Sequence, residues 1–153
     1  MPNVPGLRSC YTKVGRLVYF GRMLDKIRLH AAGKLPADYQ GNLGVGFDNR
    51  CCVFLGVNYA ALKTRTLAKG KGIDADILSW CQEQGGPRTD DQCNIWNRFI
   101  MKVGWRDDRT AVLQQRLGEY GLVGKPIETF FDLIEFDEGR NPVATRAWDL
   151  PSS

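Results

Sequence analysis

The segment FGRMLDKIRLHAAGKL, residues 20–35, predicts a helix that is apolar on two sides. At a period of 3.6 residues, one apolar stripe collects Leu17, Phe20, Leu24, Ile27 and Ala31. Val18 and Leu29 fall on another side of the same helix. Because a helix with two apolar sides is usually central, we expect a helix over about residues 14–32 to run through the core and to end at Gly33.

Charged side chains interrupt the apolar sides of this helix. They are Arg22, Asp25, Lys26, Arg28 and His30. One interpretation is a set of ion pairs on the helix surface, each worth about 0–1 kcal/mol. The other is a cationic pocket, in which Arg22, Lys26 and Arg28 surround a small anionic ligand and Asp25 orients them. Because Arg forks suit carboxylate and phosphate groups, we treat all five as candidate ligand-binding residues.

Composition indicates one ordinary globular domain. The chain has 153 residues, of which 43% are hydrophobic and 25% charged, and this balance excludes general disorder. No apolar run approaches the roughly 18 residues that cross a bilayer. The start, MPNVPGLRSC, lacks the apolar centre of a signal peptide. We therefore expect a cytoplasmic protein that does not enter a membrane.

The net charge of +4 is unevenly distributed. Residues 1–40 carry seven Lys/Arg against two acids, whereas residues 101–153 carry nine acids against seven Lys/Arg. Five of these acids lie between Glu128 and Glu138. We expect the two ends of the chain to lie near each other and to pair their charges. A basic nucleic-acid-binding face is disfavoured, because the sequence contains no block of consecutive Lys/Arg.

Helix-start and helix-stop signals predict an all-α fold of six or seven short helices. Beyond the first helix, the expected starts are Asp48, Asn58, Asp74, Thr89, Asp107 or Asp108, and Ile127. Thr89 and Gln92 form a capping box. A strand through residues 51–55 is the alternative to a helix that ends at Gly56.

Two further expectations concern packing. In the helix after Thr89, one broad face collects Ile95, Trp96, Phe99 and Val103, and we expect that face to point into the core. We expect residues 1–140 to form a single helical domain with an irregular loop around residues 33–47. We expect residues 141–153 to form a C-terminal tail that docks through Trp148.

Four segments together resemble a known family. They are PGLRSCYTKVGRLVYFGRMLDKIRLHAAGKL, DNRCCVFLGVNYAAL, DADILSWCQEQG and IWNRFIMKVGWRDD. The chain is similar over most of residues 5–140 to a bacterial family catalogued as a domain of unknown function, number 5069. Cys10 departs from the proline that the family carries there. The resemblance implies a shared fold and brings no activity, cofactor or catalytic residue.

Few residues fit a metal or a catalytic site. One histidine, no Cys-x-x-Cys pair and no His-Glu-x-x-His pattern argue against a metal, and we expect no cofactor. The segment GNLGVGFDN lacks the Gly-Lys-Ser/Thr ending of a phosphate loop. A catalytic pair is an alternative, with Cys51, Cys52 or Cys81 as nucleophile and His30 as base. Buried, unreactive thiols are nevertheless the commoner case. Near a helix end, His30 is explained most simply by the helix dipole.

Three functional hypotheses follow. The first is a domain that binds a small anionic ligand through the basic first helix. The second is a protein-interaction module, including a homodimer, that uses Trp105, Arg106 and Trp148, because aromatic and Arg side chains are enriched at interfaces. The third is an enzyme in which Asp25, His30 or a cysteine acts as acid, base or nucleophile. Binding and interaction rank above catalysis, because the sequence shows no arrangement of nucleophile, base and orienting group.

Overall fold

Helix α1 (Phe20–Ala31) lies among the other helices in a computed structural model that describes residues 3–70 and 72–145. The described residues contain seven helices of eight or more residues and two of four residues. After α1 these are α2 (Ala37–Gln40), α3 (Phe47–Leu55), α4 (Tyr59–Leu67), α5 (Asp74–Gly85), α6 (Asp90–Lys102), α7 (Thr110–Glu119), α8 (Phe130–Asp137) and α9 (Pro142–Thr145). The all-α expectation is confirmed, while Trp148 lies outside the described residues.

The chain before α1 forms a small hairpin, so the predicted helix start at residue 14 is wrong. Strands β1 (Lys13–Val14) and β2 (Leu17–Val18) pair antiparallel. Gly15 turns the chain at a φ of 57°, which glycine adopts without steric cost. Tyr19 then takes a φ of 69° and separates the hairpin from α1. Its N–H donates to the carbonyl of Cys10 at 3.0 Å, which helps to hold this unfavourable backbone conformation.

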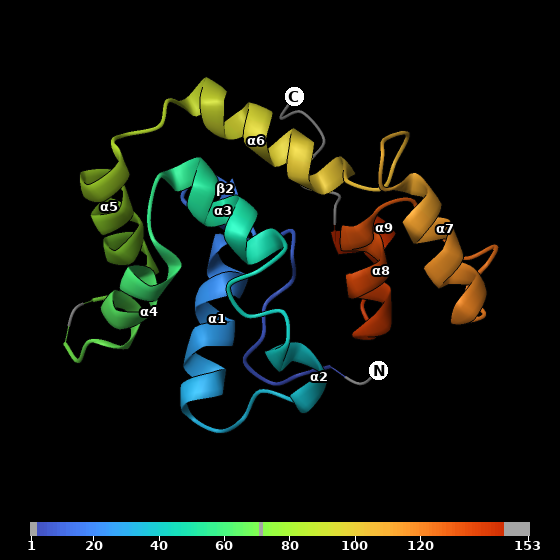
Figure 1. The fold of residues 1–153 in the computed structure, drawn as a ribbon, viewed down its shortest axis with the longest axis horizontal. Helices are drawn as coiled ribbons and strands as arrows, with labels where there is room; N and C mark the ends of the chain where they lie inside the picture. The colour runs from blue at the N-terminus through green and yellow to red at the C-terminus, as the bar shows by residue number, and fades with distance from the viewer. Residues whose placement is uncertain (1–2, 71, 146–153) are drawn as a thin grey trace.

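The apolar stripe of α1 lies at the centre of the main core. Phe20, Met23, Leu24 and Ile27 are all almost completely buried. In Figure 1, α4 lies on one side of α1 and α8 on the other. The prediction of a central helix is therefore confirmed, and Gly33 follows it at a φ of 69° as expected for a stop.

A smaller apolar cluster joins α7 to α8. It contains Leu113, Leu117, Ile127, Phe130 and Leu133. Phe47, at the start of α3, packs against both this cluster and the main core. Its ring meets that of Phe131 edge-on, with the centroids 5.2 Å apart. This contact connects the two clusters.

Several helix boundaries agree with the sequence signals. Asn58 caps α4 by accepting the N–H of Ala61, and Thr89 and Gln92 form the expected capping box before α6. The helical alternative for residues 51–55 is correct. Asp48 is not a cap, because it lies inside the first turn of α3 and is fully buried.

Two further boundaries differ from the expectation. The last long helix starts after Thr129 and not at Ile127, because the Thr129 hydroxyl accepts the N–H of Asp132 at 3.1 Å. The expected loop around residues 33–47 contains the single turn of helix α2.

The predicted buried face of α6 is only partly correct. Trp96 is buried, but Ile95 is 63% exposed and Phe99 49%. Asn97 points inward, where its side chain accepts the Val18 N–H at 3.1 Å and donates to the Arg16 carbonyl at 2.7 Å. These two bonds bind α6 to β2 and to the turn before it, and they leave Ile95 and Phe99 facing outward.

We expect Asn97→Ala to reduce the free energy of unfolding by about 1–3 kcal/mol, because it leaves the buried backbone N–H of Val18 without its acceptor. Urea denaturation followed by circular dichroism measures the change. The matched control is Asn94→Ala, which removes an exposed asparagine from the same helix and should stay within about 0.5 kcal/mol of wild type. Equal losses for the two variants would contradict this role of Asn97.

Candidate functional site

Arg22 forms a buried, two-pronged ion pair with Glu138, the residue that follows α8. Its two terminal nitrogens donate to the two carboxylate oxygens at 2.9 and 2.6 Å. The Arg22 and Glu138 side chains are only 4% and 2% exposed. Burial alone would raise the pKa of Glu138, but hydrogen bonds from Arg22, Arg140 and Tyr39 hold it below its ordinary value. Glu138 therefore stays ionised in the interior.

Lys26, one helical turn after Arg22 on α1, pairs with a different carboxylate. Its Nζ lies 2.9 Å from Oδ1 of Asp48, and the Tyr19 hydroxyl donates to the same oxygen at 2.6 Å. The other oxygen, Oδ2, accepts the N–H of Gly44 at 2.9 Å. Burial, followed by the charge of Asp48, raises the pKa of Tyr19 well above its ordinary value. Asp48 thus links α1, α3 and the glycine-rich loop before α3.

Asp25 and Arg28 belong to a third, partly exposed cluster. Asp25 accepts two hydrogen bonds from the Arg8 guanidinium, at 2.8 and 3.0 Å, and one from the Arg8 backbone N–H. Arg8 and Arg28 also pair with Asp74, at 2.6 and 2.7 Å. Burial opposes ionisation of Asp74, but hydrogen bonds from Arg28 and Arg8 hold its pKa below the ordinary value. Two guanidinium groups and two carboxylates therefore balance one another.

The structure brings together only two of the five residues that the sequence named on this helix. Asp25 and Arg28 lie 4.0 Å apart, whereas Arg22 and Lys26 pair with different carboxylates. His30 is exposed and forms no side-chain hydrogen bond or ion pair within the described residues. The partners missed at the sequence level are Arg8, Asp48, Asp74 and Glu138. The acidic excess near the C-terminal end was a signal for Glu138, and its pairing with Arg22 confirms that the two ends share charges.

The cysteine thiols and the side chains that could bind a metal are the remaining groups with possible chemistry. Burial raises the pKa of Cys81 to about 12 and that of Cys52 to about 11, so both remain protonated near neutral pH. All five cysteines are free and buried. Within the described part of the chain, no group of three or more His, Cys, Asp or Glu side chains lies in a position to hold a metal ion.

An exposed apolar surface spans α3 and α6. We call it the α3–α6 face and define it by Arg50, Val53, Ile95 and Phe99. Val53 is 69% exposed. The guanidinium carbon of Arg50 lies 5.7 Å from the centroid of the Phe99 ring. The two helices lie side by side in Figure 1, and under this face the rings of Phe54 and Trp96 stack at 5.2 Å. The face therefore rests on a packed support.

Trp105 and Arg106 follow Val103 and Gly104 after the end of α6 at Lys102. Trp105 is 46% exposed, and the guanidinium of Arg106 lies 4.8 Å from the centroid of its ring. Arg106 adopts a φ of 51°, which is uncommon for a residue other than glycine. Both residues are accessible, as an interaction role requires.

The sequence model of the family described as Domain of unknown function (DUF5069) matches residues 4–140. The chain belongs to this family. No curated protein matches the chain. The family assigns no activity, so the geometry of this member is the guide to its function. None of the helices in the described ranges is long and apolar enough to cross a membrane.

We expect Arg22→Met to reduce the free energy of unfolding by about 3–5 kcal/mol, because it leaves the Glu138 carboxylate buried without its main cation. The double variant Arg22→Met/Glu138→Leu should lose less than the sum of the two single variants. Denaturant unfolding of all four proteins gives the coupling energy. Strictly additive losses would show that the pair is not coupled.

Acidification should destabilise the protein through the same carboxylate. The pKa of Glu138 in the folded state lies below its ordinary value of 4.5, so its stabilising effect is complete above that pH and is lost as the pH falls through the folded pKa. The pKa of Asp74 in the folded state also lies below its ordinary value, 3.8. The stabilising effect of Asp74 is therefore lost in the same way as the pH falls through its folded pKa.

Urea midpoints measured between about pH 7 and pH 3 check this prediction. Glu138→Gln should be less stable at neutral pH and should lose less stability on acidification than wild type. The control is Glu83→Gln, at an exposed position on α5, which should follow the wild-type curve. Parallel curves for wild type and Glu138→Gln would contradict the assignment.

Proposed function

We propose that this protein is an interaction module that forms a homodimer through the α3–α6 face. The observation that carries the proposal is the exposure of Ile95 and Phe99 on one side of α6, together with that of Val53 on the neighbouring helix α3. Single exposed apolar residues are ordinary, whereas apolar residues grouped on a rigid face are typical of protein contacts. Arg50 over the ring of Phe99 adds the aromatic and Arg pairing that interfaces favour.

Charge along α6 favours a second copy as the partner. Asp91, in its first turn, and Lys102, at its last residue, share the exposed stripe with Ile95. In a two-fold arrangement, two antiparallel α6 helices would bring Ile95 opposite Phe99 of the second copy. Asp91 of each chain would then lie near Lys102 of the other chain. Both the apolar centre of this stripe and the charges that flank it are therefore self-complementary.

Trp105 and Arg106 extend this proposed interface beyond the end of α6. The Arg106 guanidinium over the indole ring restricts the Trp105 side chain before binding. This restriction lowers the entropy cost of association. Trp148, which the sequence analysis assigned to the same role, stays a prediction. We further propose a bacterial cytoplasmic protein, which the family resemblance and the five free thiols support.

The hypothesis of an anionic ligand on α1 receives less support. Arg22, Lys26 and Arg28 each have a carboxylate within 2.6–2.9 Å. An external anion would have to displace one of these carboxylates. Asp74 is the most exposed of them, with 21% of its side chain accessible, so Arg8 and Arg28 would be the cations that such a ligand reaches. A structural role for the α1 charges accounts for the same contacts without a ligand.

The solution mass tests the dimer. Sedimentation equilibrium of the full chain should give twice the chain mass of 17.2 kDa, and Ile95→Asp should give the mass of one chain. The control is Val123→Asp, which places the same charge at another exposed apolar residue, outside the α3–α6 face, and should leave the dimer intact.

Charge exchange distinguishes the antiparallel arrangement from other contacts. Asp91→Lys and Lys102→Asp should each weaken the dimer by placing like charges together, and the double variant should restore it. A wild-type monomer at about 100 μM would overturn the proposal, since stable specific dimers associate well below that concentration. A dimer that withstands Ile95→Asp would also overturn it.

A further inference from the structure

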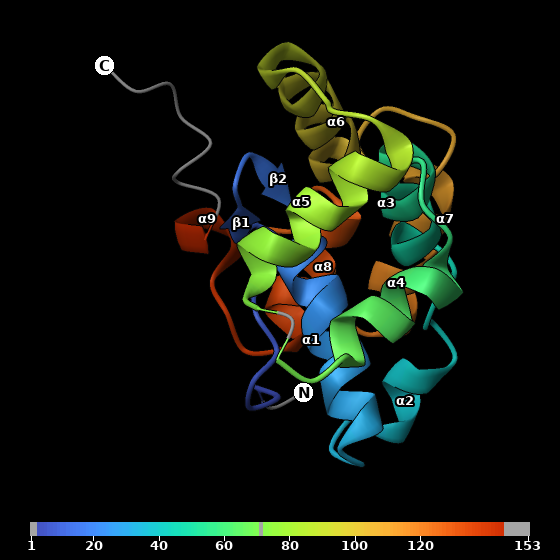
Figure 2. The same ribbon diagram turned by 90° about the vertical axis from the view of Figure 1, so that its left-hand side faces the viewer.

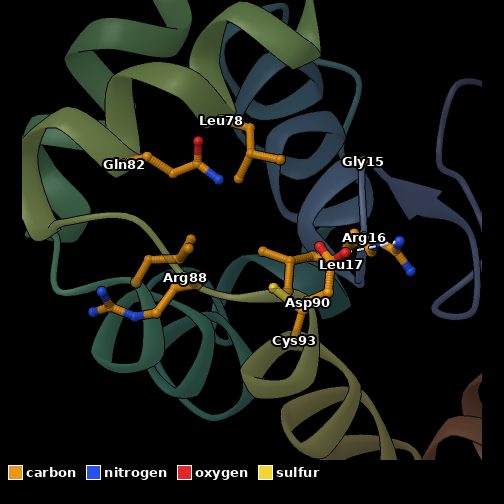
Figure 3. Close-up of a pocket in the computed structure, with 9 residues that line it drawn as sticks. Gly15, Arg16, Leu17, Leu78, Gln82, Arg88, Asp90 and Cys93 are labelled. Atoms are coloured by element: carbon orange, nitrogen blue, oxygen red, sulfur yellow. Dashed lines mark ion pairs between the residues drawn. The ribbon is translucent and has the colours of Figure 1, made fainter.

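A hollow of about 160 Å³ opens between the turn after β1, the end of α3, α5 and the start of α6. Leu17, Leu55 and Leu78 give it apolar walls, and all three side chains are buried. Figure 3 shows Gln82 of α5 across the space from Asp90 of α6. The described lining residues all lie outside the α3–α6 face, so the hollow is distinct from the proposed dimer interface.

Arg88 fixes one wall and turns its charge away from the hollow. Its Nε donates to the Phe54 carbonyl at 2.9 Å and its Nη1 to the Gly86 carbonyl at 3.0 Å, which ties the end of α3 to the end of α5. In Figure 3 the Arg88 guanidinium points away from the space between Gln82 and Asp90. Because these contacts are made within the protein, the wall is formed before a ligand arrives.

Asp90 contributes the charge that faces the hollow. Its Oδ2 lies 3.0 Å from Nη2 of Arg16, and Figure 3 shows the Arg16 guanidinium beyond this carboxylate, pointing out of the hollow. The Asp90 and Arg16 side chains are 71% and 58% exposed, and an ion pair so open to water contributes little to stability. Because a carboxylate has several acceptor positions, a cationic ligand can share Asp90 with Arg16 or take its place.

The charge of Asp90 acts inside the hollow, at Cys93. Cys93 follows Asp90 by one turn of α6 and lines the same space. Burial, followed by the charge of Asp90, raises the pKa of the Cys93 thiol above its ordinary value. Arg16 and Arg88 lower this pKa, each by less than Asp90 raises it. The strongest single charge that acts on this wall is therefore negative, which favours a cationic ligand over an anionic one.

The volume limits the ligand to about one ring. An apolar cavity of about 150 Å³ accommodates one benzene ring. We infer that this hollow binds a primary amine that carries a single aromatic ring, with the ring against the three leucines and the ammonium group donating hydrogen bonds to the Asp90 carboxylate. The N–H donors of an ammonium group suit this carboxylate, whereas the carboxylate of an anionic ligand would be repelled by it.

Benzylamine is the first probe. Titration of the isotope-labelled full chain, followed by amide chemical shifts, should show saturable changes at Gly15, Gln82 and Cys93 with a dissociation constant on the order of 1 mM. Benzyl alcohol, which has the same ring and no charge, should bind at least about threefold more weakly, and benzoate more weakly still. No saturable change at these amides with benzylamine would overturn the site. Equal binding of benzyl alcohol or benzoate would overturn its preference for a cation.

Charge variants test the role of Asp90. Asp90→Asn should weaken benzylamine binding about threefold and leave benzyl alcohol unchanged. The matched control is Asp91→Asn, which removes the same charge from the same turn of α6 outside the hollow and should bind benzylamine as wild type does. Arg16→Ala should bind benzylamine more tightly than wild type, because it removes the cation that competes for Asp90. Weaker binding in Arg16→Ala, or equal losses in the two aspartate variants, would overturn this role.

A matched pair of variants on α5 locates the binding. Gln82→Trp places an indole in the hollow and should weaken benzylamine binding at least about tenfold, whereas Gln84→Trp places it at an exposed position and should bind as wild type does. Loss of binding in Gln84→Trp, or retention in Gln82→Trp, would overturn the proposal. Thermal melts of each variant confirm that it is folded.

Discussion

The structure depends on neutralising the charges of a helix that lies in the core. Taking an ion out of water costs several kcal/mol, and only well-placed opposite charges and hydrogen bonds offset that cost. α1 carries its apolar stripe into the centre and takes Arg22, Asp25 and Lys26 with it. The rest of the chain must therefore supply a counter-charge at each of three places around this helix.

These counter-charges come from the segment before β1, from α3 and from the residue after α8. They meet α1 at Asp25, Lys26 and Arg22 respectively, within little more than one turn of the helix. A helix that slipped by one turn would move about 5.4 Å and would separate all three sets of partners together. Hydrophobic packing alone tolerates such shifts better than hydrogen-bonded ion pairs do. The ionic contacts therefore specify the register of α1 within an otherwise apolar core.

Sequence patterns predicted what depends on neighbouring residues. The central helix, the cap at Asn58 and the capping box at Thr89 follow from side chains within one turn of one another. The start of α1 was missed, because the positive φ of Tyr19 is held by contacts with Cys10 and Asp48 that no local pattern contains. The outward turn of Ile95 was missed for a similar reason, since Asn97 finds its partners 79 and 81 residues away. The candidate site divides in the same way: the charges of α1 were visible in the sequence, but their partners were not.

The pairing of Arg22 with Glu138 also has a consequence for synthesis of the protein. The two residues are 116 positions apart, so a ribosome that adds roughly 5–20 residues per second needs on the order of ten seconds to pass from one to the other. During this interval the nascent α1 cannot bury its guanidinium against the native carboxylate. Until almost all of residues 4–140 have left the ribosome, α1 must therefore stay solvated or bound to a chaperone.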